Sequence, residues 1–426
     1  MNQIIELMEK LNPWWIGKDF DSGILREKYT KKIKSYLKAN EIVILNGVRR
    51  SGKTTLLFQI IKDLIKQGVN PKAILFVNFD HADLSHLENP FKEVLDVYFQ
   101  EIAPDKRCYL IFDEVQNVKG WEKWAKSLYD EKKHQIILTG SSSQLLDNKL
   151  ATLISGRYLK IEVFPLDFRE FLEFKNIVIE NNLDLVSKKN KILKELKKLL
   201  FSGGFPKVVL EEDLSLKEET LKIYYETIIY KEILSIHDIR QKKLMKELLY
   251  YLISNFTSLY SYKNLAKLLS ADFSTIKEYF GFIEESKAFF SLSFFSYSLK
   301  VQNRNNKKIY YIDNGLRNAV SFKFSRDEGK LVENMVFVEL KRREKEVYYW
   351  QNSKKQEVDF VIKNKDDSLS AINVSYTNEI NEREFKGLVK FKNEFKKCKE
   401  LIILTKDLEK KEKGIKFIPL WKWLLI

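Results

Sequence analysis

The chain has 426 residues, of which 44% are hydrophobic and 13% aromatic, and its 74 basic and 59 acidic side chains give a net charge of +15. This length predicts two to four domains, and the hydrophobic content excludes a disordered chain. The positive charge is compatible with a polyanionic partner, although lysine spread along the whole chain is equally explained by solubility.

The cysteines, the histidines and the N-terminal residues indicate which classes of protein can be excluded. The two cysteines, Cys108 and Cys398, suggest neither a disulfide framework nor a zinc site, which indicates a reducing compartment. The four histidines lack ligand spacing, so no histidine-bound metal is expected. The opening residues "MNQIIELMEKLNPWW" lack the layout of a signal peptide, and no run approaches the ~18 apolar residues that span a bilayer. We therefore expect a cytoplasmic protein without membrane contact.

The first chemically specific motif is "GVRRSGKT", residues 47–54. It fits G-x-x-x-x-G-K-S/T, in which backbone N–H groups surround a phosphate, the lysine neutralises charge and the hydroxyl ligates Mg²⁺. The strand-like "EIVIL" precedes it, and "TTLLFQIIKDLIKQG" follows with helical spacing. We predict an ATP site in which Lys53 also acts in catalysis and Thr54 binds Mg²⁺. The residues expected to bind nucleotide are Gly47, Val48, Arg49, Arg50, Ser51, Gly52, Lys53, Thr54 and Thr55.

A second motif, "CYLIFDEVQNV", supplies acids at the end of an apolar strand. A nucleotide hydrolase needs a carboxylate near Mg²⁺ and a group that orients the attacking water. Asp113 is expected to be the metal partner and Glu114 the water-orienting residue. This adjacent glutamate favours an ATPase over a GTPase.

Two further candidates follow along the chain. In "HQIILTGSSSQLL", Ser141 is the preferred sensor of the terminal phosphate and Thr139 the weaker one, while a helix cap is the alternative role. Arg157 precedes the strand-like "YLKIEVF" at the edge of the domain. Such an arginine can stabilise charge at a neighbouring subunit's phosphate, which would require a homo-oligomer, although a solvated arginine is nearly as well supported.

Five segments together resemble a large prokaryotic family of AAA-type ATPases: "GVRRSGKTTLL", "YLIFDEVQ", "LTGSSS", "SGRYLKIEVFPLDFREFL" and "GGFPKVVL". That family joins an ATPase core to a winged helix and a C-terminal domain of restriction-endonuclease descent. The resemblance implies an α/β fold whose core is a five-stranded parallel sheet built from "EIVIL", "AILFVNF", "YLIFDE", "QIIL" and "YLKIEVF". We expect an ATPase core with an N-terminal helical extension over residues 1–166, a helical lid over 167–240, a winged helix-turn-helix over 241–325 and a nuclease-like domain over 326–426.

The predicted winged helix-turn-helix carries the candidate DNA contacts. Its second helix, in "ADFSTIKEYFGFIEESK", would enter the major groove of duplex DNA, and a basic wing would touch phosphate. Acidic residues on that helix, Glu278, Glu284 and Glu285, favour the alternative of a packing module. The candidate contacts are Ser274, Thr275 and Lys277 on the helix, and Lys300, Arg304, Lys307 and Lys308 on the wing.

The nuclease-like segment departs from the pattern that its resemblance implies. Glu333 and Asp359 match the acids of such an active site, but Asn373 and Ser375 stand where a further acid and a lysine belong. Glu357 is the one candidate for a substitute ligand, and we regard that substitution as the weaker interpretation. We expect the fold to be retained without phosphodiester cleavage.

These observations predict an Mg²⁺-dependent ATPase that couples its cycle to movement of the winged-helix and nuclease-like domains, on duplex DNA if the basic surface binds it. Two alternatives stay open at this point. One is a DNA nuclease regulated by ATP, and the other is a non-catalytic switch in which bound ATP holds a conformation for a protein partner.

Overall fold

The computed structural model describes residues 2–104, 107–141, 156–321 and 328–426. The chain forms two compact units, Met1–Val163 and Phe164–Ile426. Among the helices that these ranges contain, none has the length and apolar character needed to cross a bilayer.

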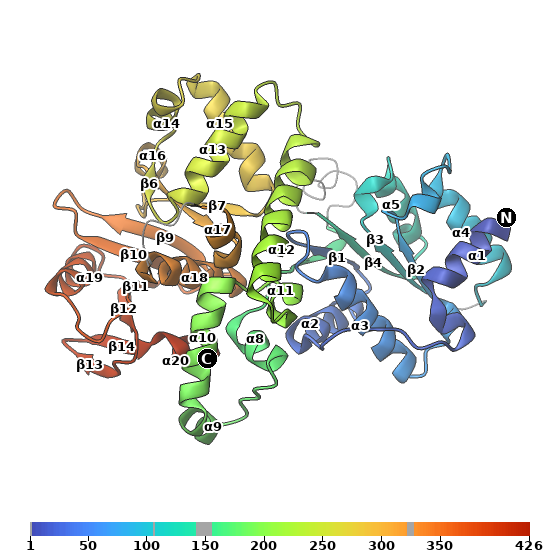
Figure 1. Cartoon of the computed structure of the whole chain (residues 1–426), viewed down its shortest axis with the longest axis horizontal. Coiled ribbons are helices and arrows are strands. Elements are labelled where there is room, and N and C mark those ends of the chain that lie inside the picture. The colour runs from blue at the N-terminus through green and yellow to red at the C-terminus, as the bar shows by residue number, and fades with distance from the viewer. Residues whose placement is uncertain (1, 105–106, 142–155, 322–327) are drawn as a thin grey trace. The chain divides into compact units, whose positions relative to one another are not determined.

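The first unit is built on a parallel sheet of five strands in the order β2-β3-β4-β1-β5 (Figure 1). The five strands predicted from the sequence are confirmed: β1 (Ile42–Asn46), β2 (Ile74–Asn78), β3 (Tyr109–Asp113), β4 (Gln135–Gly140) and β5 (Tyr158–Glu162). β1 and β4 are buried at every position, as expected for central strands of a parallel sheet with both faces covered.

Helices pack against this sheet, and the first two of them, α1 and α2, belong to the N-terminal segment that precedes β1. α1 contacts β2 and α4, and α2 contacts α3, β1 and β5. The N-terminal segment is tied to β2, because the indoles of Trp14 and Trp15 both donate to the carbonyl of Ile74, at 3.1 and 2.8 Å. Within the described residues, the helices of this unit are α1 (Asn2–Leu11), η1 (Pro13–Ile16), α2 (Glu27–Leu37), α3 (Lys53–Lys66), η2 (Pro71–Ala73), η3 (Ala82–Leu84), α4 (Pro90–Glu101), η4 (Val115–Asn117) and α5 (Trp121–Asp130).

Strand order brings the ends of three strands together. β4 lies between β1 and β3, so its carboxyl end is flanked by the loop that follows β1 and by Asp113 at the end of β3. In open α/β sheets, ligands bind at the carboxyl ends of the strands where the strand order reverses. The topology therefore gathers the predicted nucleotide-binding residues at one edge of the sheet.

The second unit begins with helices. They are α8 (Phe168–Phe174), α9 (Asn182–Ser187), α10 (Lys189–Ser202), α11 (Pro206–Leu210), α12 (Leu214–Thr227) and the π-helical η5 (Ile228–Leu234). The break between α10 and α11 contains Gly203 and Gly204, and the backbone N–H of Gly204 donates to buried Asp313 at 2.7 Å. A Cβ at Gly203 would lie 1.9 Å from the Asp313 carboxylate, which requires glycine there.

The next elements form a three-stranded antiparallel sheet, β6-β8-β7, with helices beside it. They are α13 (Lys242–Ser254), β6 (Leu259–Tyr260), α14 (Tyr262–Leu268), α15 (Phe273–Glu285), β7 (Phe289–Leu292), α16 (Leu299–Arg304), β8 (Lys307–Tyr311) and α17 (Asn314–Val320). In the segment "FFSLSFFSYSL", residues 289–299, only the start forms a regular strand, β7. Lys300 and Arg304 lie on the short α16 and not on a β-wing.

The C-terminal part carries a mixed six-stranded sheet in the order β13-β14-β12-β11-β10-β9. β11, β12 and β14 run parallel, and the remaining pairs are antiparallel. Its elements are α18 (Glu328–Arg342), β9 (Glu346–Gln351), β10 (Glu357–Lys363), β11 (Leu369–Ser375), α19 (Glu382–Glu394), β12 (Cys398–Thr405), β13 (Lys410–Glu412), β14 (Ile415–Pro419) and α20 (Leu420–Leu425). The expected boundary at residues 325 and 326 lies outside the described residues.

Candidate nucleotide site

The loop between β1 and α3 depends on its glycines. Gly47 packs against the chain leaving β5, and a Cβ at Gly47 would lie 2.2 Å from the carbonyl oxygen of Val163. Gly52 has a φ of 100°, a left-handed conformation that side chains rarely adopt. Arg50 also lies in the left-handed region, with a φ of 68°. The loop thus has a fixed, unusual backbone path, as a loop that presents its N–H groups to an anion requires.

Lys53 begins α3 and is buried under this loop. Its ammonium donates to the carbonyl oxygens of Gly47, at 3.0 Å, and Val48, at 3.3 Å. The hydroxyl of buried Ser51 has no hydrogen-bond partner among the residues that the structure describes. The loop therefore combines a buried cation with an unsatisfied donor, both at the start of a helix, where anions are favoured.

Asp113 lies opposite this lysine at the end of β3 and is fully buried. The hydroxyl of Thr54 donates to its Oδ2 at 2.8 Å, and the hydroxyl of Thr139 donates to its Oδ1. Burial and the neighbouring carboxylate of Glu114 raise the pKa of Asp113 to about 6, although the two hydroxyls and Lys53 oppose this shift. The predicted pair of metal-binding groups, Thr54 and Asp113, is thus in direct contact.

Glu114 adopts a left-handed backbone conformation, with a φ of 54°. Its N–H donates to the Thr139 hydroxyl at 3.1 Å, and its carboxylate contacts Arg49 at 3.7 Å and the side-chain amide of Gln116. This left-handed backbone costs about 1 kcal/mol or more, and the contacts with Thr139, Arg49 and Gln116 hold Glu114 in that conformation.

The two remaining candidates lie in different places. Ser141 follows β4 and is buried, and its hydroxyl has no hydrogen-bond partner among the described residues. Arg157 precedes β5 and contacts Asp130 at 3.8 Å, with its guanidinium 5.9 Å from the Tyr129 ring centre. It lies next to the amino end of β1, whereas the loop follows the carboxyl end. Roughly 13 Å of strand separates the two ends, so Arg157 does not join Lys53 within one chain.

Sequence reasoning missed one buried cation beneath the loop. Arg26 is buried, its guanidinium donates to the backbone carbonyl of Ser51 at 2.7 Å, and its backbone N–H donates to Gln59 at 3.1 Å. The residue lies just before α2 and belongs to no motif, so no sequence signal identified it. It fixes the loop from the side of the N-terminal segment.

Thr139, the weaker of the two predicted phosphate sensors, makes contacts that were not anticipated from the sequence. Its hydroxyl joins Asp113 to the backbone of Glu114, which links the two acids. The position of Thr139 near the end of β4, which pairs with β3 in a parallel sheet, is the signal that could have indicated this contact.

These residues fit the phosphates of a nucleotide with Mg²⁺. Lys53 and the loop offer positive charge and donors, and the unsatisfied hydroxyls of Ser51 and Ser141 are available to further oxygen atoms. Thr54 and Asp113 offer oxygen ligands of the kind that Mg²⁺ prefers. Among the residues that the structure describes, no group of three or more His, Cys, Asp or Glu residues is arranged to hold a metal ion by itself.

The candidate DNA contacts differ in their exposure to solvent. Ser274 and Lys277 are exposed on α15, with Thr275 partly buried between them, and Lys300, Arg304 and Lys307 are at least partly exposed. The expectation for Lys308 was wrong, because this side chain is buried and paired with Glu333 at 2.9 Å. Alternation along β8 turns Lys308 inward and Lys307 outward.

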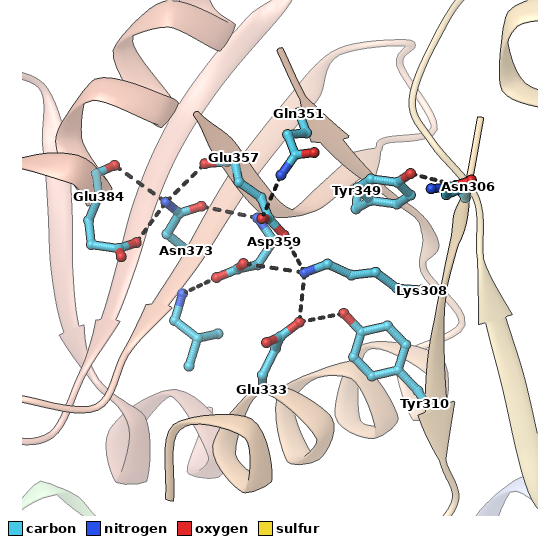
Figure 2. A network of polar contacts seen from close by, with 11 residues as sticks. Asn306, Lys308, Tyr310, Glu333, Tyr349, Gln351, Glu357, Asp359, Asn373 and Glu384 are labelled. Atoms are coloured by element: carbon cyan, nitrogen blue, oxygen red, sulfur yellow. Dashed lines mark hydrogen bonds and ion pairs between the residues drawn. The ribbon is translucent and has the colours of Figure 1, made fainter. Parts of the chain in front are cut away.

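The three acids of the C-terminal segment that were weighed as nuclease residues lie together. Glu333, Glu357 and Asp359 surround the Lys308 ammonium (Figure 2). Asn373, in place of an acid, accepts from the Asp359 N–H at 3.1 Å and donates to Glu384 at 3.0 Å. Ser375 ends β11 without a lysine at that position.

The fold and the site define a P-loop nucleotide-binding protein, and residues 39–172 match the family model described as "AAA domain". The chain therefore contains an AAA-type ATPase domain. Residues 193–327 and 328–423 match models described as domains of unknown function, DUF8612 and DUF4143.

The chain belongs to the same family as "Uncharacterized protein MJ1544" of Methanocaldococcus jannaschii, with which it is 36% identical over 93% of this chain and 90% of that protein. An "Uncharacterized protein" of Haemophilus influenzae is 30% identical over 94% of this chain and 98% of that protein. Among solved structures, the Walker-type ATPase PABY2304 of Pyrococcus abyssi is 14% identical, with a TM-score of 0.47 over 70% of this chain and 96% of that one.

Proposed function

We propose that this protein is an Mg²⁺-dependent ATPase in which Lys53 and the loop of residues 47–52 bind the phosphates. The single observation that carries the proposal is the contact between Thr54 and Asp113 at 2.8 Å, beside a buried lysine at the start of α3. This pairing gives Mg²⁺ two oxygen ligands next to the phosphate-binding loop.

Each residue of the site has a distinct task in this proposal. Lys53 exchanges its bonds to loop carbonyls for bonds to phosphate oxygens, and the loop N–H groups hold the same phosphates. Thr54 and Asp113 would hold Mg²⁺, which would supply positive charge to the phosphates. Glu114 accepts a hydrogen bond from the attacking water and orients it, while Ser141 donates to the terminal phosphate.

Nucleotide binding requires a rearrangement around Glu114. Its carboxylate contacts Arg49 and Gln116, and both partners must be left or shared for the carboxylate to reach a water molecule. Arg49 thus gives the cationic loop a second task besides phosphate binding, since it controls the position of the water-orienting group.

The cycle drives movement of the segments after the ATPase core, and duplex DNA is the proposed polyanionic partner. Support comes from exposed Ser274 and Lys277 at the start of α15, together with exposed Lys300 and Arg304. Cleavage of DNA is not part of this proposal, because Asn373 and Ser375 replace the acid and the lysine that it needs.

Steady-state ATP hydrolysis by the wild type and Glu114→Gln tests the proposal, with and without duplex DNA at one fixed, moderate salt concentration. Loss of the water-orienting carboxylate is expected to lower kcat by about 100-fold or more, with ATP binding retained. The matched control is Glu131→Gln, which removes an exposed acid of the same unit.

The outcomes separate the proposed activity from its partner. If DNA stimulates turnover and Glu114→Gln abolishes it, both the ATPase activity and the DNA partner are supported. If turnover is the same with and without DNA, the ATPase activity is supported and the DNA partner is contradicted. ATP binding without turnover in the wild type contradicts the ATPase and favours a switch for a protein partner.

A further inference from the structure

Two aromatic side chains that reach solvent lie side by side in the second unit, on the neighbouring helices α14 and α15 (Figure 1). Tyr262 is the first residue of α14 and Phe273 is the first residue of α15. Their ring centres are 6.3 Å apart, and the rings are nearly perpendicular, at 81°. The Tyr262 ring also contacts buried Phe280 at 5.0 Å, which anchors this aromatic patch of Tyr262 and Phe273 to the core.

The chemistry of the patch limits what can cover it. Phe273 is 54% exposed, and its ring has no hydrogen-bonding group, so a partner can contact it only through apolar or aromatic surface. Aromatic rings of this kind stack on nucleobases whatever the base. In a duplex, the faces of each base are covered by the neighbouring base pairs, and a ring reaches them only where a strand is unpaired.

Three lysines accompany the two rings. Lys307 of β8 places its ammonium 5.8 Å from the centre of the Tyr262 ring. Lys263 follows Tyr262, Lys277 lies one helical turn after Phe273, and both lysines are exposed. Within the described ranges, the ammonium groups of these three lysines form no ion pair or hydrogen bond. They are therefore available to the phosphates of a strand that stacks on the rings.

The acids of α15, which favoured a packing module, are in part engaged inside the protein. The carboxylate of Glu284 accepts a backbone N–H of β7 at 3.2 Å, and that of Glu285 contacts His237 at 3.5 Å. Asp272 and Glu278 are exposed. Three lysines without an ion pair outnumber these two acids, so the surroundings of the aromatic patch keep a net positive charge that complements a polyanion.

We propose that Tyr262 and Phe273 stack on unpaired bases of single-stranded DNA, while Lys263, Lys277 and Lys307 contact its phosphates. The DNA partner then carries a single-stranded segment. Because stacking does not depend on the identity of the base, this segment is bound without strong sequence preference. The inference rests on the DNA partner of the proposed function, but it does not depend on ATP hydrolysis.

Fluorescence anisotropy tests the proposal on the full-length protein without nucleotide, with a labelled single strand of about 16 nucleotides and a duplex of the same length. Phe273→Ala and Tyr262→Ala are each expected to weaken binding of the single strand by about 5- to 100-fold, because one stacked base is lost. Binding of the duplex should be nearly unchanged in both variants, since phosphate contacts dominate there.

Conservative variants separate stacking from a structural role. Phe273→Leu keeps an apolar side chain without a ring and should lose affinity as Phe273→Ala does, whereas Phe273→Trp should keep it. The matched control is Tyr230→Ala, at an exposed tyrosine of η5 whose ring lies 4.8 Å from the Lys246 ammonium. It is expected to bind the single strand as the wild type does. If Phe273→Ala does not fold, the comparison of Phe273→Leu with Phe273→Trp decides.

A strand that contains 2-aminopurine reports stacking directly, because the fluorescence of this base changes when a ring stacks on it. The change is expected with the wild type and not with Phe273→Leu. Equal affinities of the wild type and Phe273→Leu for the single strand would overturn the proposal. An equal loss of affinity for single strand and duplex would do the same, as would a wild type that binds the corresponding RNA strand but not the DNA strand.

The outcome for this patch can be told apart from the outcome for the ATPase. A wild type whose turnover is stimulated by duplex DNA, but which binds no single strand, contradicts the stacking proposal alone. A wild type that binds the single strand through Phe273 without hydrolysing ATP supports the stacking proposal and contradicts only the ATPase.

Discussion

Asp113 is the residue at which the requirements of folding and of the proposed metal binding oppose each other. A carboxylate must be ionised to hold Mg²⁺, yet this one is fully buried and has a second carboxylate beside it. Thr54 and Thr139 compensate in part by donating hydroxyl hydrogen bonds to it. Without a cation, the ionised form is the unstable one, so that nucleotide and metal binding should relieve a stress built into the site.

This conflict predicts a pH-dependent stability in the absence of nucleotide. The folded pKa of Asp113, about 6, lies above the ordinary 3.8, so folding takes up a proton, and the stability gained below about pH 3.8 is lost as the pH rises through about 6. Asp113→Asn should remove this loss and stabilise the nucleotide-free protein at about pH 8 by about 1–3 kcal/mol, while abolishing hydrolysis.

Thermal unfolding of both proteins between about pH 5 and about pH 8 measures this effect. The wild type should lose stability across that interval, relative to Asp113→Asn. Parallel stability profiles for the two proteins would show that Asp113 does not titrate in this interval.

At the scale of elements, the loop between β1 and α3 is supported from two sides. Gly47 rests against the backbone that leaves β5, and Arg26 from the N-terminal segment holds the carbonyl of Ser51. A loop whose N–H groups must point at a ligand needs such supports, because its own glycines make it flexible in the unfolded chain.

Replacement of one glycine should show this dependence. In Gly47→Ala, the added Cβ would meet the Val163 carbonyl at 2.2 Å, and the loop or β5 must move. We expect a loss of about 1–3 kcal/mol of stability together with loss of ATP binding. Gly68→Ala is the matched control, since Gly68 also has a positive φ, of 85°, but its Cβ would meet nothing within 4 Å.

Denaturant unfolding and binding of a fluorescent ATP analogue measure the two effects. Gly68→Ala should lose less stability than Gly47→Ala and keep its affinity for the analogue. Equal behaviour of the two variants would show that backbone conformation, and not the close approach to Val163, determines the cost.

At the scale of the whole molecule, the open question is whether one chain is sufficient for catalysis. The described residues of a single chain place Lys53, Asp113 and Glu114 together, but Arg157 lies at the opposite end of the sheet beside Asp130. If Arg157 acts on a phosphate, it does so on that of another copy.

Arg157→Ala is therefore expected to lower turnover by about 10³-fold while ATP binding stays intact. A mixture with Glu114→Gln should recover activity, because a mixed pair can contain one complete site with Glu114 from one chain and Arg157 from the other. Arg107→Ala, at an exposed arginine of the same unit, serves as the control. A fall in ATP binding as large as that in Lys53→Ala would contradict a role for Arg157 in a second subunit.

The sequence by itself determined the five strands, the loop and the two acids at the end of β3. These features are local, since apolar runs and a fixed spacing of glycine, lysine and threonine are sufficient to define them. The absence of an acid and a lysine from the nuclease pattern could also be recognised from the sequence, because Asn373 and Ser375 stand at those two positions.

Only the tertiary structure decided which distant side chains complete the sites. Arg26 meets a loop 25 residues away, and Lys308 meets acids up to about 50 residues further along the chain. Lys308 belonged to a basic stretch that predicted phosphate contact, and strand alternation turned it into the interior. Pairing across such distances follows from how elements pack, because the free energy of a buried charge depends on the groups that packing brings around it and not on its neighbours in sequence.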